Sequence, residues 1–149
     1  MKTVRQLIFE RTRELLSATG TNVFVNRMSD VNDSQCPAYL LYEPSQNSNN
    51  RLAYNEVEHN MGMVVQGIVV SDDDELISGL INDLYANAVE ALQAEGAYGD
   101  LIIDILEMGL EISVDERESG LASASFDLTF EVRYTTSIGD ARSAPTIGG

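Results

Sequence analysis

The chain has 149 residues, the length of one ordinary domain, and 44% of them are hydrophobic, as in folded proteins. Nine Lys/Arg residues against 24 Asp/Glu residues give a formal net charge of −15, which disfavours binding to phosphate backbones and to anionic membranes. The single cysteine excludes a disulfide within the chain.

The first predicted element is an amphipathic helix over about residues 3–18. Thr3 is a suitable N-cap, and Gly20 lies where a helix commonly ends. Between them, large apolar residues recur at helical spacing: Val4, Leu7, Ile8, Leu15 and Leu16. The pattern predicts a helix that packs one face on a core.

Two short strands are predicted next, over residues 22–25 and 38–42. The second ends before Pro44, because proline cannot extend a hydrogen-bonded ladder. The polar segment 44–53 that follows is predicted to be a loop. For its most polar part, Ser45–Asn50, two interpretations stay open: a flexible excursion without a role, or a segment that becomes ordered on a partner.

A long β-type segment over residues 56–70 exceeds the length of a typical strand. Either Gly62 marks a bulge or break, or the first half of the segment projects from the body as a hairpin arm. The second half, Met63–Val70, is apolar on both faces, which is typical of a central strand covered on both sides.

A second helix of about twenty residues is predicted to follow the acidic run Asp72–Glu75 and to end at Glu95, before Gly96. Ser71 or Asp72 can cap it, and the acids then lie at the positive end of the helix dipole. The alternative is a Mg²⁺ or Ca²⁺ site, but consecutive acids point in different directions around a helical turn. Capping is the favoured interpretation.

The clearest pattern predicts an antiparallel hairpin near the C-terminus. Apolar residues occupy the even positions of segments 108–114 and 122–134, so both strands can turn them to one face. The expected register places Val114 opposite Ala122 and closes the hairpin with a five-residue turn over 116–120.

No motif in the sequence favours catalysis. The GxSxG, P-loop, GxGxxG and HExxH patterns are all absent. Cys36 and the only histidine, His59, could form a nucleophile pair, but no third orienting group is apparent, and a lone histidine beside Glu58 is typical of a surface position. We therefore expect no enzyme activity, no catalytic residues, and no bound metal or cofactor.

The segment Tyr98–Thr135 contains a series of local motifs. These are Gly99-Asp100-Leu101-Ile102, the acidic turn Asp115-Glu116-Arg117-Glu118, the run Ala124-Ser125-Phe126-Asp127-Leu128-Thr129-Phe130 and the ending Glu131-Val132-Arg133-Tyr134. Together with the order of the predicted elements, they resemble the tail terminator proteins of long-tailed phages, the family of the lambda minor tail protein U type. Weaker similarity extends back to Val4. The polar segment 44–53 and the C-terminal extension depart from the short members of that family.

The resemblance implies an α/β (α+β) fold with a mixed, mostly antiparallel sheet, two main helices packed on one face and a long C-terminal β-hairpin. We expect one domain over residues 1–135, with the polar loop at 44–53, and a flexible tail over 136–149. Such proteins assemble as hexameric rings on the finished end of the tail tube. The ring stops tube polymerisation and offers the surface that joins the tail to the capsid neck.

The expected partners are therefore other copies of the chain, the tail tube protein and a neck or head-completion protein. DNA would pass through the ring without specific binding, since an acidic lumen repels phosphates. The expected location is the head–tail junction of the virion, after assembly in the host cytoplasm. Two alternatives stay open: a phage neck or head-completion protein, and an acidic DNA mimic that inhibits a DNA-binding protein.

A ring of such acidic subunits has to offset its own repulsion. Buried apolar contact, bound cations, or pairing of scarce arginines across subunits could do so. The polar face of the hairpin and its turn supply the candidate subunit-interface residues: Arg117, Arg133, Glu111, Asp127 and Glu131. A neighbouring subunit could also cover the second face of Met63–Val70.

Overall fold

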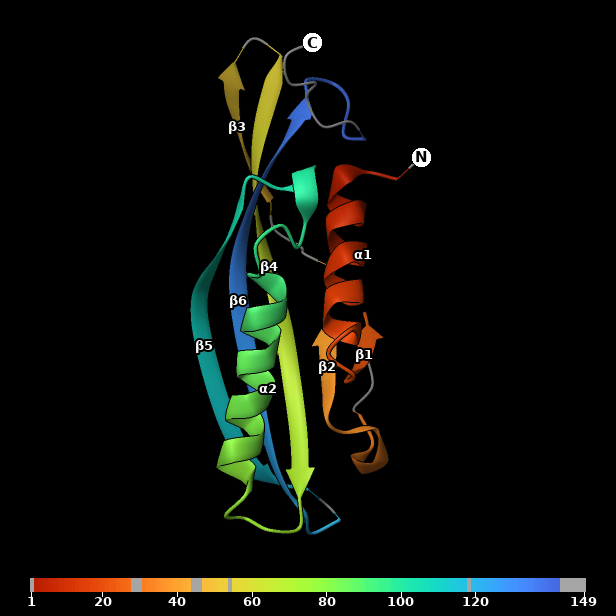
Figure 1. Cartoon of the computed structure of the whole chain (residues 1–149), viewed down its shortest axis with the longest axis vertical. Coiled ribbons are helices and arrows are strands. Elements are labelled where there is room, and N and C mark those ends of the chain that lie inside the picture. The colour runs from red at the N-terminus through yellow and green to blue at the C-terminus, as the bar shows by residue number, and fades with distance from the viewer. Residues whose placement is uncertain (1, 28–30, 44–46, 54, 118, 143–149) are drawn as a thin grey trace.

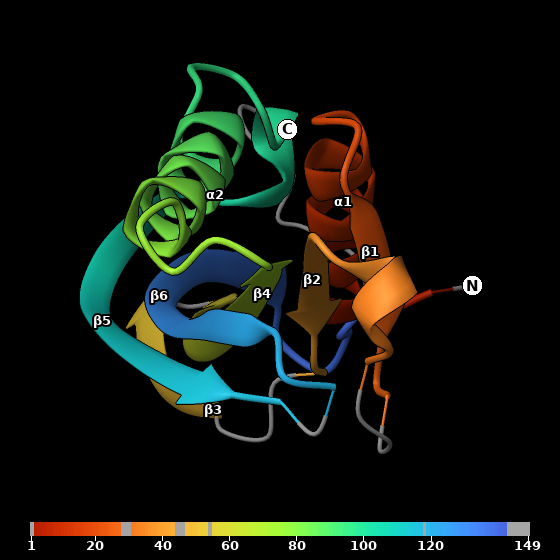
Figure 2. The ribbon, with the colours of Figure 1, turned by 90° about the horizontal axis from the view of Figure 1, so that it is seen from below.

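Both α-helices of the chain lie on one face of a single twisted sheet (Figures 1 and 2). The computed structural model describes residues 2–27, 31–43, 47–53, 55–117 and 119–142. The elements, in chain order, are α1 (Val4–Ser17), β1 (Asn22–Val25), the 3-10 turn η1 (Asp33–Gln35), β2 (Ala38–Leu41), β3 (Asn47–Ala53), β4 (Glu56–Ser71), α2 (Ile77–Leu92), the 3-10 turn η2 (Gly99–Leu101), β5 (Asp104–Glu116) and β6 (Ala122–Ser137).

The sheet has the strand order β1-β2-β4-β6-β5, and β3 pairs with β4. β1 and β2 are parallel, whereas the other pairs are antiparallel. The predicted fold class is confirmed: one α+β domain with a mixed, mostly antiparallel sheet, 44% strand and 28% helix.

The main core lies between the sheet and the two helices. Odd positions of β4, such as Met63, pair with even positions of β6, such as Phe130, and both sets are buried under the helices. Thr3 caps α1 as predicted, in a capping box with Gln6. The helix side of the sheet is therefore the closed side of the molecule.

A smaller cluster lies on the other face, here called the outer face. Ile68 packs there against the buried residues Val31, Ala38 and Leu40. The apolar second face of Met63–Val70 is thus covered in part by the chain's own β2 and by the segment that precedes it, rather than by a neighbouring subunit alone.

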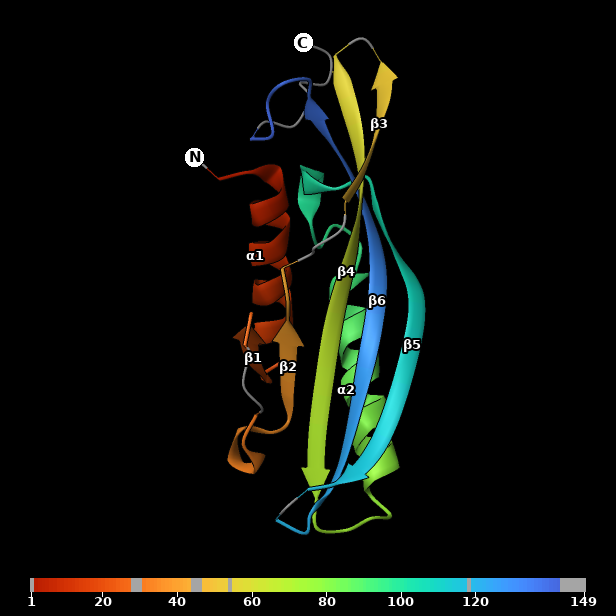
Figure 3. The same ribbon diagram turned by 180° about the vertical axis from the view of Figure 1, so that it is seen from behind.

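β4 is one unbroken strand, and its pairing with β6 runs without a register shift through Gly62. The bulge interpretation is therefore wrong, and the projecting arm is observed: the start of β4 rises with β3 and the end of β6 above the helices (Figures 1 and 3). Residues 47–53, expected to belong to a loop, form β3 because they pair along β4 as far as Met61. Residues 44–46 lie outside the described residues.

α2 begins later than predicted, at Ile77, and its N-cap Leu76 makes no side-chain capping bond. Ser71 and Asp73 instead stabilise the preceding turn: the Ser71 hydroxyl accepts from the Asp73 amide at 3.1 Å, and the Asp73 carboxylate from the Glu75 amide at 2.9 Å. The capping interpretation is therefore wrong. Within the described ranges, no group of three or more His, Cys, Asp or Glu side chains could hold a metal ion.

The fold continues past the expected domain end at residue 135. β6 reaches Ser137, the Ile138 amide donates to the Asn55 carbonyl at 2.9 Å, and the Val4 amide donates to the Ala141 carbonyl at 2.9 Å. The predicted tail therefore begins no earlier than residue 143, where the described residues end. None of the helices in the described ranges is both long enough and apolar enough to cross a membrane.

Candidate subunit interface

The hairpin of β5 and β6 forms with the predicted facing but with a register two residues away from the expected one. Val114 pairs with Ala124 instead of Ala122. The paired residues accordingly end at Glu116 and begin again at Ala122; between them the Arg117 amide donates to the Leu121 carbonyl at 2.9 Å and Gly120 adopts a positive φ of 85°, and residue 118 lies outside the described residues. Glycine adopts this conformation at low cost, so Gly120 suits its position in the turn.

A β-bulge between Glu107 and Gly109 reverses the facing of the first part of β5. Glu107 therefore pairs with Phe130 and lies on the helix side, where the Tyr85 hydroxyl donates to its carboxylate. This bond raises the pKa of Tyr85, since it holds the phenol beside a negative charge. Met108 lines a hollow on the outer face together with Gly62. The sequence pattern predicts the reverse, with Met108 on the helix side and Glu107 on the outer face.

Three of the candidate interface residues, Glu111, Asp127 and Glu131, share the outer face of the hairpin. Glu111 and Asp127 are direct cross-strand partners, an arrangement that like charges disfavour. Gln66 on β4 donates to the Asp127 carboxylate at 2.7 Å, which relieves part of this repulsion. The outer face is therefore acidic in its centre.

The fourth candidate, Arg133, lies on the same face and is paired within its own chain. Its guanidinium holds the Asp104 carboxylate through two hydrogen bonds, one of them at 2.8 Å from Nε, and Glu58 stands 4.0 Å away. The bond from Arg133 lowers the pKa of Asp104, and the same pairing raises the pKa of Arg133. Arg133 thus fastens the start of β5 to β6.

The fifth candidate, Arg117, connects the hairpin turn to the segment between β1 and β2. Its guanidinium pairs with Asp33 and donates to the Val31 carbonyl. It also lines a polar hollow of about 540 Å³ with Asn32, Asp33, Asp115, Glu116, Ser119 and Ser123. Arg117 and Arg133 therefore have intrachain roles, and their pairing across subunits stays a prediction.

The largest unexpected feature is the exposure of β5. This strand lies at the end of the sheet order, and α2, which reaches it through hydrogen bonds to Glu107 and Ile105, packs mainly on β4 and β6. Its large apolar residues, here called the β5 rim, are Leu106 (47% exposed), Met108 (58%), Leu110 (37%), Ile112 (42%) and Val114 (65%). Leu110, Ile112 and Val114 face the helix side, as predicted, yet each remains at least one third exposed.

Cys36 and His59 lie in different parts of the structure. Cys36 packs against the outer-face cluster around Val31. His59, on the projecting arm, stacks on Tyr134 with 4.6 Å between ring centroids, and its ring nitrogens contact Asn49 and Thr136, each at 2.8 Å. Burial lowers the pKa of His59. The histidine ring is thus held by structural contacts within the arm.

No protein-family model matches the chain, and a search of curated proteins found no significant match. The geometry of the hairpin and of the β5 rim therefore supplies the evidence for a function.

Proposed function

We propose that the chain is a structural subunit of a long-tailed phage virion, of the tail terminator type. Copies of it would form a homo-oligomeric ring, a hexamer by the family resemblance, on the end of the tail tube. The ring would end tube polymerisation and present the surface that joins the tail to a neck or head-completion protein at the head–tail junction. In this role the chain has no enzyme activity and needs no cofactor.

The β5 rim is the observation that carries the proposal. Five large apolar side chains stand 37–65% exposed along one 13-residue edge strand. Apolar side chains gathered along an open edge favour pairing with another chain, and a subunit built for assembly leaves such a surface exposed until it meets its neighbour.

The charge of the outer face is compatible with a channel for DNA. Glu111, Asp127 and Glu131 give this face a negative potential that disfavours phosphate contacts. If the outer face lines the lumen, DNA can pass without adhering to it.

Tube capping tests this function directly. Purified protein is added to growing tail tubes, and negative-stain images record tube ends and tube lengths. We expect a ring at one end of each tube and no further elongation. An unrelated protein of equal negative charge serves as the control. Tubes that elongate as before, with bare ends, would contradict the proposal.

A DNA mimic is the alternative from another class, and it makes a different prediction. It would bind a basic DNA-binding protein as a monomer or dimer, with an affinity that falls steeply as salt is raised. A head-completion protein would form rings that bind the capsid vertex and leave tube growth unchanged. The capping experiment therefore separates the terminator from both alternatives, and free rings in the same images would distinguish a head-completion protein from a mimic.

A further inference from the structure

The β5 rim belongs to a strand whose charge is entirely of one sign. β5 carries five carboxylates (Asp104, Glu107, Glu111, Asp115 and Glu116) and no lysine, arginine or proline. Lysine and proline are common means by which edge strands avoid pairing, so this strand is protected mainly by its acids and its one bulge. Its partner has to bring apolar contact and positive charge together.

A second β5 strand does not meet this requirement. Symmetric pairing of two rims would place two sets of five carboxylates along one contact, and like charges directly opposite one another destabilise strand pairs. Rim-to-rim dimers are therefore disfavoured, although the apolar side chains alone would permit them.

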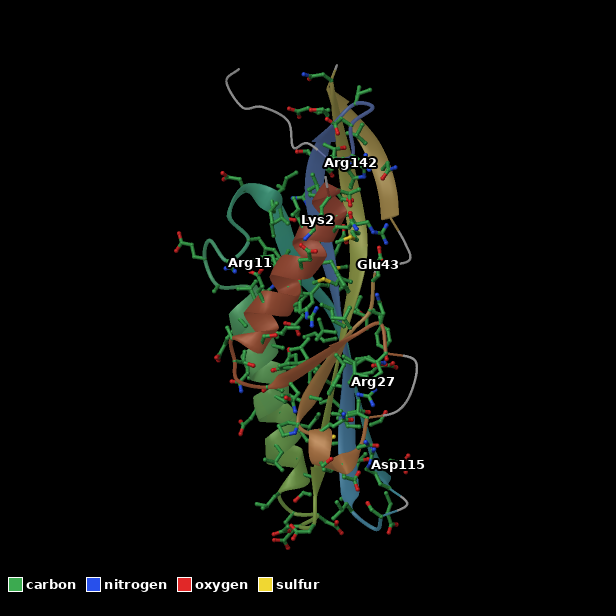
Figure 4. All side chains as sticks on the ribbon, turned by 90° about the vertical axis from the view of Figure 1, so that its right-hand side faces the viewer. Lys2, Arg11, Arg27, Glu43, Asp115 and Arg142 are labelled. Carbon is green, nitrogen blue, oxygen red and sulfur yellow. The ribbon has the colours of Figure 1, made fainter. Side chains whose placement is uncertain are left out.

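Most of the Lys/Arg residues lie at the other margin of the molecule, beside α1 and β1. Figures 1 and 2 show α1 and β5 at opposite sides of the layered structure, and Figure 4 looks onto the side that carries α1. Six of the nine Lys/Arg residues gather here and define the α1 margin: Lys2, Arg5, Arg11, Arg13, Arg27 and Arg142. Two carboxylates of α1 pair with cations of this margin, Glu10 with Lys2 and Glu14 with Arg11.

Contacts within the chain fix this margin in place. Arg11 donates from Nε to the Ala97 carbonyl at 2.8 Å, and its Nη1 pairs with Glu14 at 3.0 Å. Arg27 lies over the Phe24 ring at 4.7 Å. Arg13 is exposed on α1, where it can reach a neighbouring molecule.

We infer that the β5 rim docks on the α1 margin of a second copy of the chain, so that copies join head to tail. Complementary charge orients the contact, and burial of the rim supplies the affinity. Each copy contacts one neighbour through its β5 rim and another through its α1 margin, so the contact is heterologous. Such contacts close into a ring if the rotation between copies permits. The inference rests on the proposed function, since it specifies how the subunits of that ring meet.

Two single variants disable one margin each. Ile112→Gln removes apolar contact from the rim, and Leu80→Gln is its control, because Leu80 is 40% exposed on α2 against 42% for Ile112. Arg13→Glu reverses a charge on the α1 margin. Its control is the double variant Ser78→Asp/Asn87→Asp, which adds the same negative charge at two exposed positions of α2. Thermal melts verify that all four variants are folded.

Sedimentation velocity at matched concentration measures the assembly. We expect Ile112→Gln and Arg13→Glu each to weaken association about tenfold or more, and both controls to assemble like the wild type. The decisive sample is the equimolar mixture of Ile112→Gln and Arg13→Glu. In this mixture the intact rim of an Arg13→Glu copy can dock on the intact α1 margin of an Ile112→Gln copy. The two remaining margins are both altered, so the mixture should form dimers and nothing larger.

Each other outcome overturns the inference in a distinct way. If Ile112→Gln forms rings like the wild type, the rim is not the contact, although the proposed function stands. If Arg13→Glu assembles like the wild type while Ile112→Gln does not, the α1 margin is not needed and the contact is rim to rim. If the wild type stays monomeric while its rim captures another protein, the occupant is not a second copy. Head-to-tail assembly of a wild type that never caps tubes would uphold the inference and contradict the proposed function.

Discussion

The Phe126 ring on β6 lies over Gly67, its cross-strand partner on β4, and fills the space that a Cβ atom at residue 67 would occupy. Tyr39 and Tyr85 pack edge-on against the same ring, with centroids 6.4 and 6.1 Å away. Glycine at 67 therefore lets an aromatic side chain reach the centre of the sheet.

Gly67→Ala is expected to destabilise the protein by about 1–3 kcal/mol, because the enclosed ring has to move. The loss should shrink when Phe126 is replaced by leucine in the same chain, since the clash is then reduced. Urea unfolding of the two single variants and the double variant measures this coupling. Additive losses would show that the ring and the glycine do not interact in this way.

Phe126 and its neighbour Ser125 test the facing of β6. Phe126 is 1% exposed in the core, whereas Ser125 lies on the outer face opposite Ile68. Phe126→Ala should lower the free energy of unfolding by about 3–5 kcal/mol, and Ser125→Ala should leave it almost unchanged. Equal destabilisation by the two changes would contradict the assigned faces.

Tyr98 is expected to make stability depend on alkaline pH. It is buried, its hydroxyl lies 2.6 Å from that of Thr12, and burial raises its pKa to about 12 from 10. A raised pKa in the folded state means that this stability is fully present below pH 10 and is lost as pH rises through 12. The free energy of unfolding, measured in urea at about pH 8 and pH 11, should fall less for Tyr98→Phe than for the wild type, by about 1.4 kcal/mol.

Asp104 is expected to make the stability of the fold depend on pH in the acidic range. The bond from Arg133 lowers its pKa, so its stabilisation is present above the unfolded value of 3.8 and is lost as pH falls through the lower folded value. Because the pair is partly exposed, Asp104→Asn should cost under about 1 kcal/mol at neutral pH. The cost should vanish in strong acid. Asp83→Asn, at an exposed position of α2, serves as the control. A cost of Asp104→Asn that persists in acid would show that the carboxylate charge is not its source.

Salt is expected to favour assembly. Each copy carries −15, and raising salt from about 0.01 M to about 1 M shortens the screening length from about 30 Å to about 3 Å. Added salt weakens the long-range repulsion between copies more than it weakens the short-range contacts at an interface. Sedimentation across this range should show larger assemblies at high salt, and smaller ones would indicate that pairing of opposite charges dominates.

Local patterns predicted the elements of the hairpin well but not the details that depend on distant residues. The period-two alternation gave the facing of Phe126 and Leu110, because side chains alternate strictly along a strand. It could not reveal the bulge at Glu107–Gly109, which shifts the pattern by one residue. Nor could it place the turn, since both registers satisfy the same alternation.

The candidate interface residues show a second limit. The sequence grouped Arg117 and Arg133 with nearby acids, but Arg117 pairs with Asp33, far away in the chain. Only the fold brings these two together. The exposure of Ile112 was equally hidden, because an apolar residue on the helix side is buried only where a helix reaches it. The sequence indicates which side a residue faces, and the sheet order decides whether that side is covered.

The mass of the wild-type particle at tube ends shows whether copies of the chain form a closed ring there. Mass photometry of concentrated protein in salt, with and without tail-tube ends, counts the copies in each assembly. The account predicts a closed ring, with about six copies by the family resemblance, that is enriched when tube ends are present. A protein that stays monomeric at high concentration, in salt and with tube ends present, would contradict it.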